Sequence, residues 1–301
     1  IYRLIVVICF MLVIGTSELR AQNIIVNDMQ PPIVVNQDGS SVTVTPTGSV
    51  TLIGGSLDAA IRGVGNDMTV INEGSVISQG GDNSPAILIQ GLNGRVDSSG
   101  TIEITGSSII GDGAFVRSTG MIISGLTDNN EGISIVGDKA TVISTGSFMS
   151  TGSNAEGLSV DGDNATVESS GDFESTGSNS EAISITGDNA ELTSRGLIST
   201  DGFESEGISL SGNNIMAERR DPIQTTGIDS EGISATGDDL TLTVYDAIST
   251  QDLDSEGISI EGADSILKVN GPISCQGIDA AGSSATGDNT QLTVRVPIST
   301  K

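Results

Sequence analysis

Residues 181–205 read EAISITGDNAELTSRGLISTDGFES, and residues 206–230 read EGISLSGNNIMAERRDPIQTTGIDS. A glutamate opens each of these units, and the same residue recurs every 25 positions at Glu131, Glu156, Glu181, Glu206, Glu231 and Glu256. A fixed period of this length is typical of one structural unit stacked on copies of itself. A repeated residue therefore belongs to a column along the stack, and columns build surfaces more often than single active sites.

Apolar residues alternate with polar ones inside each unit, which is the period of a β-strand and not of a helix. The first strand of the unit supplies one apolar column, in which Ile183, Ile208 and Ile233 are equivalent. Two further short strands follow, separated by Gly-Asp-Asn and by Gly-rich corners. The sequence therefore predicts an all-β fold, a single-stranded parallel β-helix with three short strands in each coil of about 25 residues, right-handed like other parallel crossovers.

The glycine after the first strand serves as a landmark for counting coils. It occurs at Gly39, Gly65, Gly91, Gly111, Gly137, Gly162, Gly187, Gly212, Gly237, Gly262 and Gly287, which predicts about eleven coils. We expect positive φ angles at these glycines. The Asp and Asn residues that follow them, such as Asp163-Asn164, are expected to hydrogen-bond their own backbone in turns.

The chain divides into three segments. Residues 1–21 resemble a secretory signal peptide, with Arg3 before the apolar run Leu4–Ile14 and cleavage after Ser17 or Ala21. Residues 22–38 are expected to be an N-terminal lead-in or cap, and residues 39–301 to be β-helix repeats that continue beyond Lys301. We therefore expect the protein to be secreted. Removal of Cys9 with the signal would leave Cys275, predicted to be a buried small residue, without a disulfide partner.

Composition excludes some classes of function. The formal net charge is −27, and the chain has no histidine. Nucleic acid is therefore not an expected partner, because phosphate binding needs a basic surface. Without histidine there is no Ser-His-Asp triad and no His-based metal site. We expect no catalytic residues and no cofactor; a polysaccharide lyase or hydrolase that uses paired carboxylates remains an alternative.

Two columns are candidate sites. The glutamates Glu131 to Glu256 are expected to be solvated at corners of the coil, with calcium bridging between coils as the alternative. We expect calcium chelation to leave the fold intact, and loss of the β-sheet circular dichroism signal on adding EGTA would contradict this. The other column is a hydroxyl face that could bind glycans or ice, formed by Ser134, Ser159, Ser184, Ser209, Ser234, Ser259 and Ser284. The Arg219-Arg220 pair beside Asp221 is interpreted as local charge pairing.

Two units carry a family resemblance. Residues 162–177, GDNATVESSGDFESTG, and residues 187–202, GDNAELTSRGLISTDG, are similar to the passenger repeats of bacterial autotransporters. The likeness covers roughly residues 39–301. It implies export to the periplasm of a Gram-negative cell, passage through an outer-membrane β-barrel supplied in cis or in trans, and display as a stalk or adhesin. A glycan or protein on a host or another cell would then be the partner.

Overall fold

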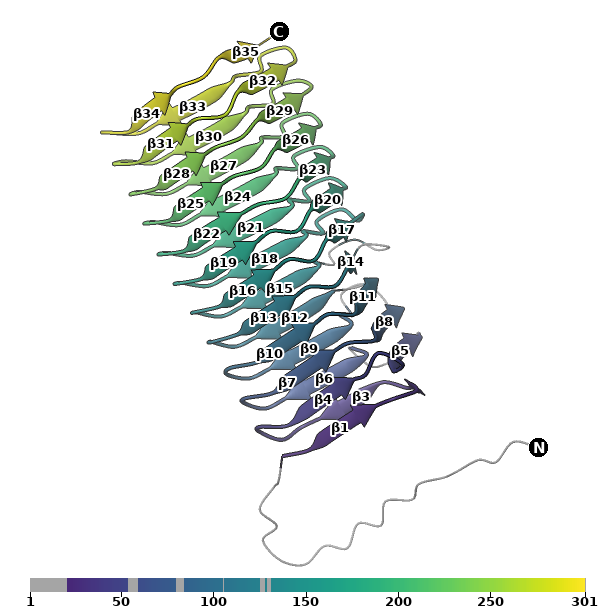
Figure 1. The fold of residues 1–301 in the computed structure, drawn as a ribbon. Coiled ribbons are helices and arrows are strands. Elements are labelled where there is room, and N and C mark those ends of the chain that lie inside the picture. The colour runs from purple at the N-terminus through teal and green to yellow at the C-terminus, as the bar shows by residue number, and fades with distance from the viewer. Residues whose placement is uncertain are drawn as a thin grey trace, which may run out of the picture.

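The computed structural model describes residues 21–53, 59–79, 84–104, 106–124, 128 and 131–300. The predicted signal peptide lies outside the described residues except for Ala21, as do Cys9 and Lys301. The described chain forms short parallel strands that stack into a rod with one strand of each coil on each of three sides (Figure 1). The predicted parallel β-helix with three strands per coil is therefore confirmed.

Each side of the rod is one continuous parallel sheet, and the sheets contain 12, 12 and 11 strands. Sheet A follows the Gly-Asp-Asn corner and consists of β1 (Asn23–Val26), β4 (Ser41–Val44), β7 (Thr69–Asn72), β10 (Arg95–Ser98), β13 (Phe115–Ser118), β16 (Thr141–Ser144), β19 (Thr166–Ser169), β22 (Glu191–Ser194), β25 (Met216–Arg219), β28 (Thr241–Val244), β31 (Ile266–Val269) and β34 (Gln291–Val294).

Sheet B consists of β2 (Met29–Gln30), β5 (Ser49–Ile53), β8 (Ser75–Gln79), β11 (Thr101–Ile104), β14 (Ile122–Ser124), β17 (Phe148–Ser150), β20 (Phe173–Thr176), β23 (Ile198–Asp201), β26 (Ile223–Thr226), β29 (Ile248–Gln251), β32 (Ile273–Gln276) and β35 (Ile298–Thr300). Sheet C consists of β3 (Ile33–Val35), β6 (Ile61–Val64), β9 (Ile87–Gln90), β12 (Ser107–Ile110), β15 (Ile133–Val136), β18 (Leu158–Asp161), β21 (Ile183–Thr186), β24 (Ile208–Ser211), β27 (Ile233–Thr236), β30 (Ile258–Glu261) and β33 (Ser283–Thr286).

The apolar columns predicted from the alternation form the core. Ile183 pairs with Ile208, and Ile208 pairs with Ile233, in the same parallel register. All three side chains are at most 1% exposed. Phe148 and Phe173 stack with their ring centroids 4.3 Å apart. A single coil cannot bury its own apolar residues. The stacking of equivalent apolar side chains in successive coils is therefore what excludes water from the core.

The glycine corners show why the repeat tolerates no side chain there. Gly91 has a φ of 148°, and a Cβ atom placed on it would overlap the carbonyl oxygen of Gly65 in the preceding coil. The register corrects one landmark, because β4 pairs Ser41 with Thr69 and so places Gly39 opposite Asp67, not opposite Gly65. The expected lead-in, residues 22–38, contains β1, β2 and β3, and each of them pairs with a strand of the next coil.

A column of buried serines at the corner between sheets B and C stands out only in the structure. Ser180, Ser205, Ser230 and Ser255 are fully buried. The hydroxyl of Ser205 accepts the backbone N–H of Ser180 at 3.1 Å and donates to the carbonyl oxygen of Gly177 at 2.6 Å. Equivalent bonds recur at the neighbouring coils. Each serine therefore binds an N–H and a carbonyl group of the preceding coil, which fixes how one coil sits on the next.

Candidate binding faces

The glutamate column lies at the corner that leads into sheet C. Its members are half-buried, which corrects the expectation of freely solvated carboxylates. Burial first, and then a neighbouring glutamate (Glu181 for Glu156, Glu206 for Glu181), raise the pKa of Glu156 and of Glu181 to about 7. Burial also raises the pKa of Glu131, Glu206 and Glu231. Each carboxyl is therefore both desolvated and close to a like group, and such columns favour sharing protons over full ionisation.

The aspartate corner beside each landmark glycine works differently from the expected turn. The Oδ1 atom of Asp163 accepts the backbone N–H of Asp188 at 2.8 Å, and that of Asp188 accepts the N–H of Asn213 at 2.7 Å. The acceptor thus binds the next coil and not its own turn, as it does in most coils from Asp38 to Asp238. This role explains the Asp and Asn column without a metal ion.

Replacing Asp188 by alanine is expected to lower the free energy of unfolding by roughly 1 kcal/mol, because the N–H of Asn213 loses its acceptor. Asparagine at the same position keeps an acceptor oxygen, as Asn213 itself does toward the N–H of Asp238 at 2.9 Å. Urea unfolding of the two variants checks this. Equal stability of the alanine and asparagine variants would contradict the proposed role of the side-chain oxygen.

The predicted hydroxyl face forms as one straight column on the outside of sheet C. Ser184 pairs with Ser209, and Ser209 pairs with Ser234, with the same register continuing to Ser134 and to Ser284. The side chains are half-buried between the buried inward positions of the same strands. The structure therefore brings the seven serines together, next to the glutamate column at the start of sheet C.

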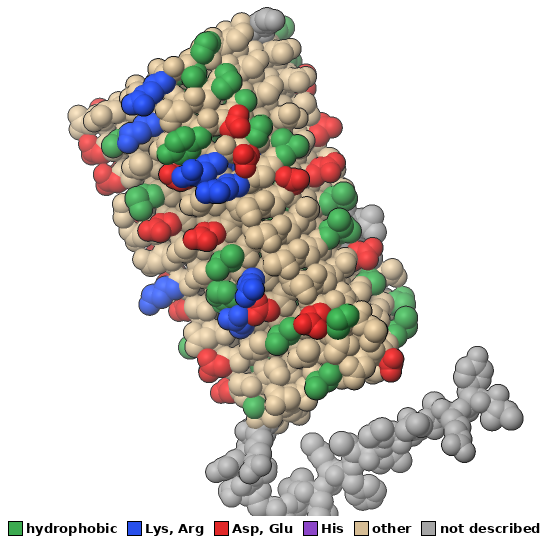
Figure 2. Space-filling model, viewed as in Figure 1, with side chains coloured by type: hydrophobic (Ala, Val, Ile, Leu, Met, Phe, Trp, Pro, Cys, Tyr) green, Lys and Arg blue, Asp and Glu red, His purple; other side chains and the backbone are tan. Residues whose placement is uncertain are grey.

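A third face emerges only when the register of sheet A is known. Its outward positions, and the residues that follow its strands, carry six of the nine Lys and Arg residues that the structure describes: Arg95, Arg117, Arg195, Arg220, Lys268 and Arg295. Figure 2 shows these basic side chains spread along one side of the rod. Five acids share the same columns, namely Glu73, Asp97, Glu168, Glu191 and Glu218. This face is thus nearly neutral, in a chain whose formal net charge is −27.

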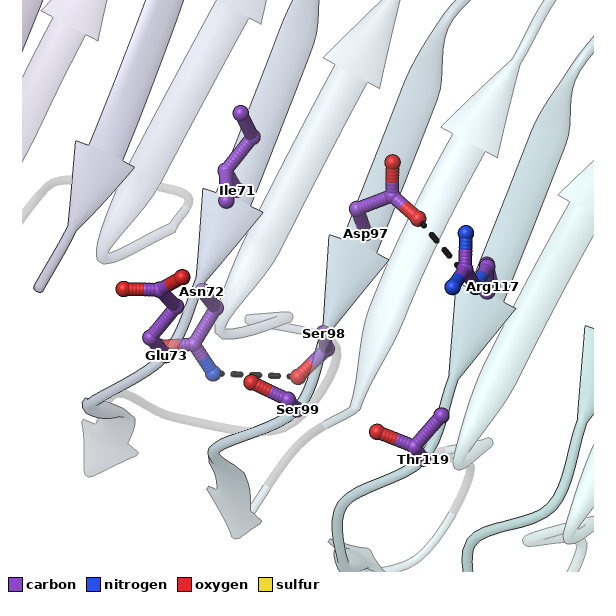
Figure 3. Close-up of a pocket in the computed structure, with 8 residues that line it drawn as sticks. All are labelled: Ile71, Asn72, Glu73, Asp97, Ser98, Ser99, Arg117 and Thr119. Carbon is purple, nitrogen blue, oxygen red and sulfur yellow. Dashed lines mark hydrogen bonds and ion pairs between the residues drawn. The ribbon is translucent and has the colours of Figure 1, made fainter. Parts of the chain in front are cut away.

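Shallow hollows follow one another along the sheet A face. The first is lined by Glu73, Asp97, Arg117 and Thr119 at the ends of β7, β10 and β13 (Figure 3). There the Arg117 Nε atom lies 4.0 Å from Asp97 Oδ1. Further hollows lie beside Arg195 and beside Met216. Paired charges and hydroxyls in open hollows suit hydrogen bonding to an extended polar ligand.

Arg219 and Arg220 behave differently, which corrects half of the charge-pairing interpretation. Arg220 is exposed, forms an ion pair of 2.8 Å with Glu218 and lies over the ring of Tyr245. Arg219 is 1% exposed and points into the core, where it donates to Ser194 Oγ at 2.8 Å, to the carbonyl of Pro222 at 2.7 Å and to that of Gly196. Burial lowers the pKa of Arg219 to about 10, and the negative charge of Asp221 is the largest effect in the opposite direction.

Among the described residues, no group of three or more Cys, Asp or Glu side chains is arranged to hold a metal ion. Cys275 is buried and free, as predicted for a small core residue. No described helix is long and apolar enough to cross a membrane. No family model, curated protein or solved structure matches this chain.

Proposed function

We propose that the chain is an extracellular β-helical passenger, a stalk or adhesin of an autotransporter-like surface protein that binds partners through its extended faces. The observation that carries the proposal is the unbroken register of the three sheets from β1 to β35, which stacks equivalent outward positions along the rod, as in the serine column from Ser134 to Ser284. With coils about 4.8 Å apart, this spacing presents a regular array to a partner. The partner class that fits such arrays is an extended glycan or protein on a host or another cell.

Two faces support the adhesive part of the proposal. The serine column of sheet C offers hydroxyl groups in a straight row, and the sheet A face offers paired charges beside shallow hollows. Both are open surfaces along the rod, which matches binding to a polymer better than binding to a small molecule. An outer-membrane β-barrel, in cis or in trans, would provide the route to the surface.

The proposal is tested by expressing the full chain in a Gram-negative host together with an outer-membrane β-barrel, fused to the chain or supplied in trans. Antibody labelling of intact cells should detect the rod outside the outer membrane, and retention in the cytoplasm would contradict the export part. A glycan array probed with the secreted rod tests the binding part. Tryptophan at Ser184 and Ser234 should block the serine face, and glutamate at Arg117 and Arg195 should block the sheet A face. Release of new reducing ends from an acidic polysaccharide would instead favour the lyase or hydrolase alternative.

A further inference from the structure

Four consecutive coils carry an exposed apolar ridge at the corner between sheets B and C. We define the ridge as Phe203, Ile228, Leu253 and Ile278, which are 45%, 42%, 41% and 69% exposed. These residues follow β23, β26, β29 and β32, whose ends lie along one edge of the rod (Figure 1). The three preceding coils have Asp128, Ser153 and Ser178 at the same position. A column that is polar in three coils thus becomes apolar in the next four.

Folding does not account for the apolar side chains of the ridge. The backbone there is held by bonds between coils, since the N–H of Glu204 donates to the carbonyl of Ile228 at 3.0 Å and the N–H of Asp229 donates to that of Leu253 at 3.1 Å. The coil with Ser178 in this column forms the same bond, from the N–H of Asn154 to the carbonyl of Ser178 at 2.9 Å. The corner therefore closes equally well with a polar residue, and large side chains left exposed in a row mark an interaction site.

Acidic residues border the ridge on both sides. The next residue in each of the four coils is Glu204, Asp229, Asp254 or Asp279, and these acids form a parallel column. Asp201 and Asp252 lie on the other side, and the half-buried glutamates Glu206, Glu231 and Glu256 follow two residues after the acidic column. A partner must therefore combine an apolar stripe with flanking positive charge.

The spacing of the ridge distinguishes between kinds of partner. Neighbouring side chains repeat at about 4.8 Å, so the four span about 14 Å. One turn of an α-helix rises about 5.4 Å, so three turns of a helix laid along the rod match four coils closely. In an extended strand the side chains on one face repeat at about 6.6–7 Å, which does not match the ridge spacing of about 4.8 Å. A second copy of this chain would place one acidic column against another, and an anionic lipid surface would be repelled likewise.

We propose that the ridge is a docking site for a basic amphipathic helix of another protein, lying parallel to the rod with its apolar stripe on the four side chains. This mode corresponds to recognition of a helix through apolar residues at i, i+3, i+4 and i+7. The acidic columns would orient the helix through its lysine and arginine flanks. The inference goes beyond the proposed function and does not depend on export or on glycan binding. The docking proposal and the proposed function can therefore fail independently of each other.

The test uses an 18-residue fluorescent peptide of leucine and lysine with the leucines on one helical face. Its binding to the full chain is measured by fluorescence anisotropy at physiological salt. In one variant all four ridge residues are replaced by serine, which is the natural residue at this position in the two preceding coils (Ser153 and Ser178). This variant should bind the peptide at least about tenfold more weakly, because apolar anchors dominate such interfaces. The matched control replaces four exposed apolar residues elsewhere, Val136, Met149, Leu197 and Met216, by serine, and should change binding less than about twofold.

A second variant keeps the proposal falsifiable if the serine variant loses its circular dichroism signal. Ser153→Ile with Ser178→Ile extends the ridge to six coils and should tighten binding of a 25-residue peptide several-fold. Equal binding by wild type and both ridge variants would overturn the proposal. So would ridge-dependent dimerisation in sedimentation experiments, or ridge-dependent binding to phosphatidylcholine vesicles without any effect on the peptide.

Discussion

Replacing Glu156 and Glu181 by glutamine is expected to raise the free energy of unfolding at pH 8 by roughly 2–5 kcal/mol for the pair. Burial and neighbouring glutamates raise the pKa of each residue from 4.5 to about 7. Above pH 7 both groups are ionised in the folded rod, half-buried and next to like charges. Glutamine has the same shape without the charge, so the variant avoids this cost, and its amides can form hydrogen bonds along the column.

The pH dependence follows from the direction of the shift. A carboxyl whose pKa is higher in the folded state binds protons more tightly there, so the stability of the rod falls as the pH rises from about 4.5 to about 7. Above about pH 7 the penalty is constant, and below about pH 4.5 both states are protonated. Wild type should therefore gain stability on acidification from pH 8 to pH 5, and the glutamine variant should gain less, with the remainder coming from Glu131, Glu206 and Glu231, whose pKa values burial also raises.

Urea unfolding at pH 5 and pH 8 measures both effects. The charge-matched control replaces Glu168 and Glu174, which are exposed on β19 and β20, by glutamine. The control removes the same net charge but no half-buried carboxyl, so it reports the general repulsion within the acidic chain. If the control stabilises the rod at pH 8 as much as the Glu156 and Glu181 variant does, the glutamate column has no special part in the pH dependence.

The period of the sequence could predict the stacking but not the surroundings of each column. Alternation places Ile183 and Ile208 in the core because burial of apolar area decides which side of a strand faces inward. At a corner the chain turns, and alternation no longer says which way a side chain points. The half-burial of Glu181 depends on that local turn, as does the burial of Ser205 one residue before the next glutamate. Neither the half-burial of Glu181 nor the burial of Ser205 could therefore be predicted from the repeated residue type alone.

Charged positions show the same limit. Arg219 has the strand position of Ser194 and of Val244, which are buried, so the register alone places it inward. Because arginine is charged, Arg219 was expected at the surface. The hydrogen bonds to backbone carbonyls that hold its side chain inside are visible only in the structure. The charge pattern of sheet A also needs the register, because coils of 20 and 26 residues shift Arg95 and Arg117 away from the period of 25. The apolar ridge, by contrast, keeps that period and is recognisable in the sequence.

Ile208→Asp is expected to be the most damaging single substitution, with a loss of more than about 4 kcal/mol in the coils around it. Ile208 is 1% exposed and lies in β24 between Ile183 and Ile233, so a carboxylate there would have apolar neighbours above and below. In a stack whose units contact only their neighbours, one failed coil removes two interfaces. Unfolding should therefore lose its single transition, and limited proteolysis should cut near residues 206–231.

Ser209→Asp is the control, because Ser209 is the next residue of the same strand and faces outward between Ser184 and Ser234. An aspartate there has access to water and should cost less than about 1 kcal/mol. Amide hydrogen exchange of both variants locates the damage: protection should be lost in the coil of Ile208 and its two neighbours for Ile208→Asp, and kept for Ser209→Asp. Similar losses in the two variants would mean that inward and outward positions do not differ in burial, and the core columns on which the fold rests would have to be reassigned.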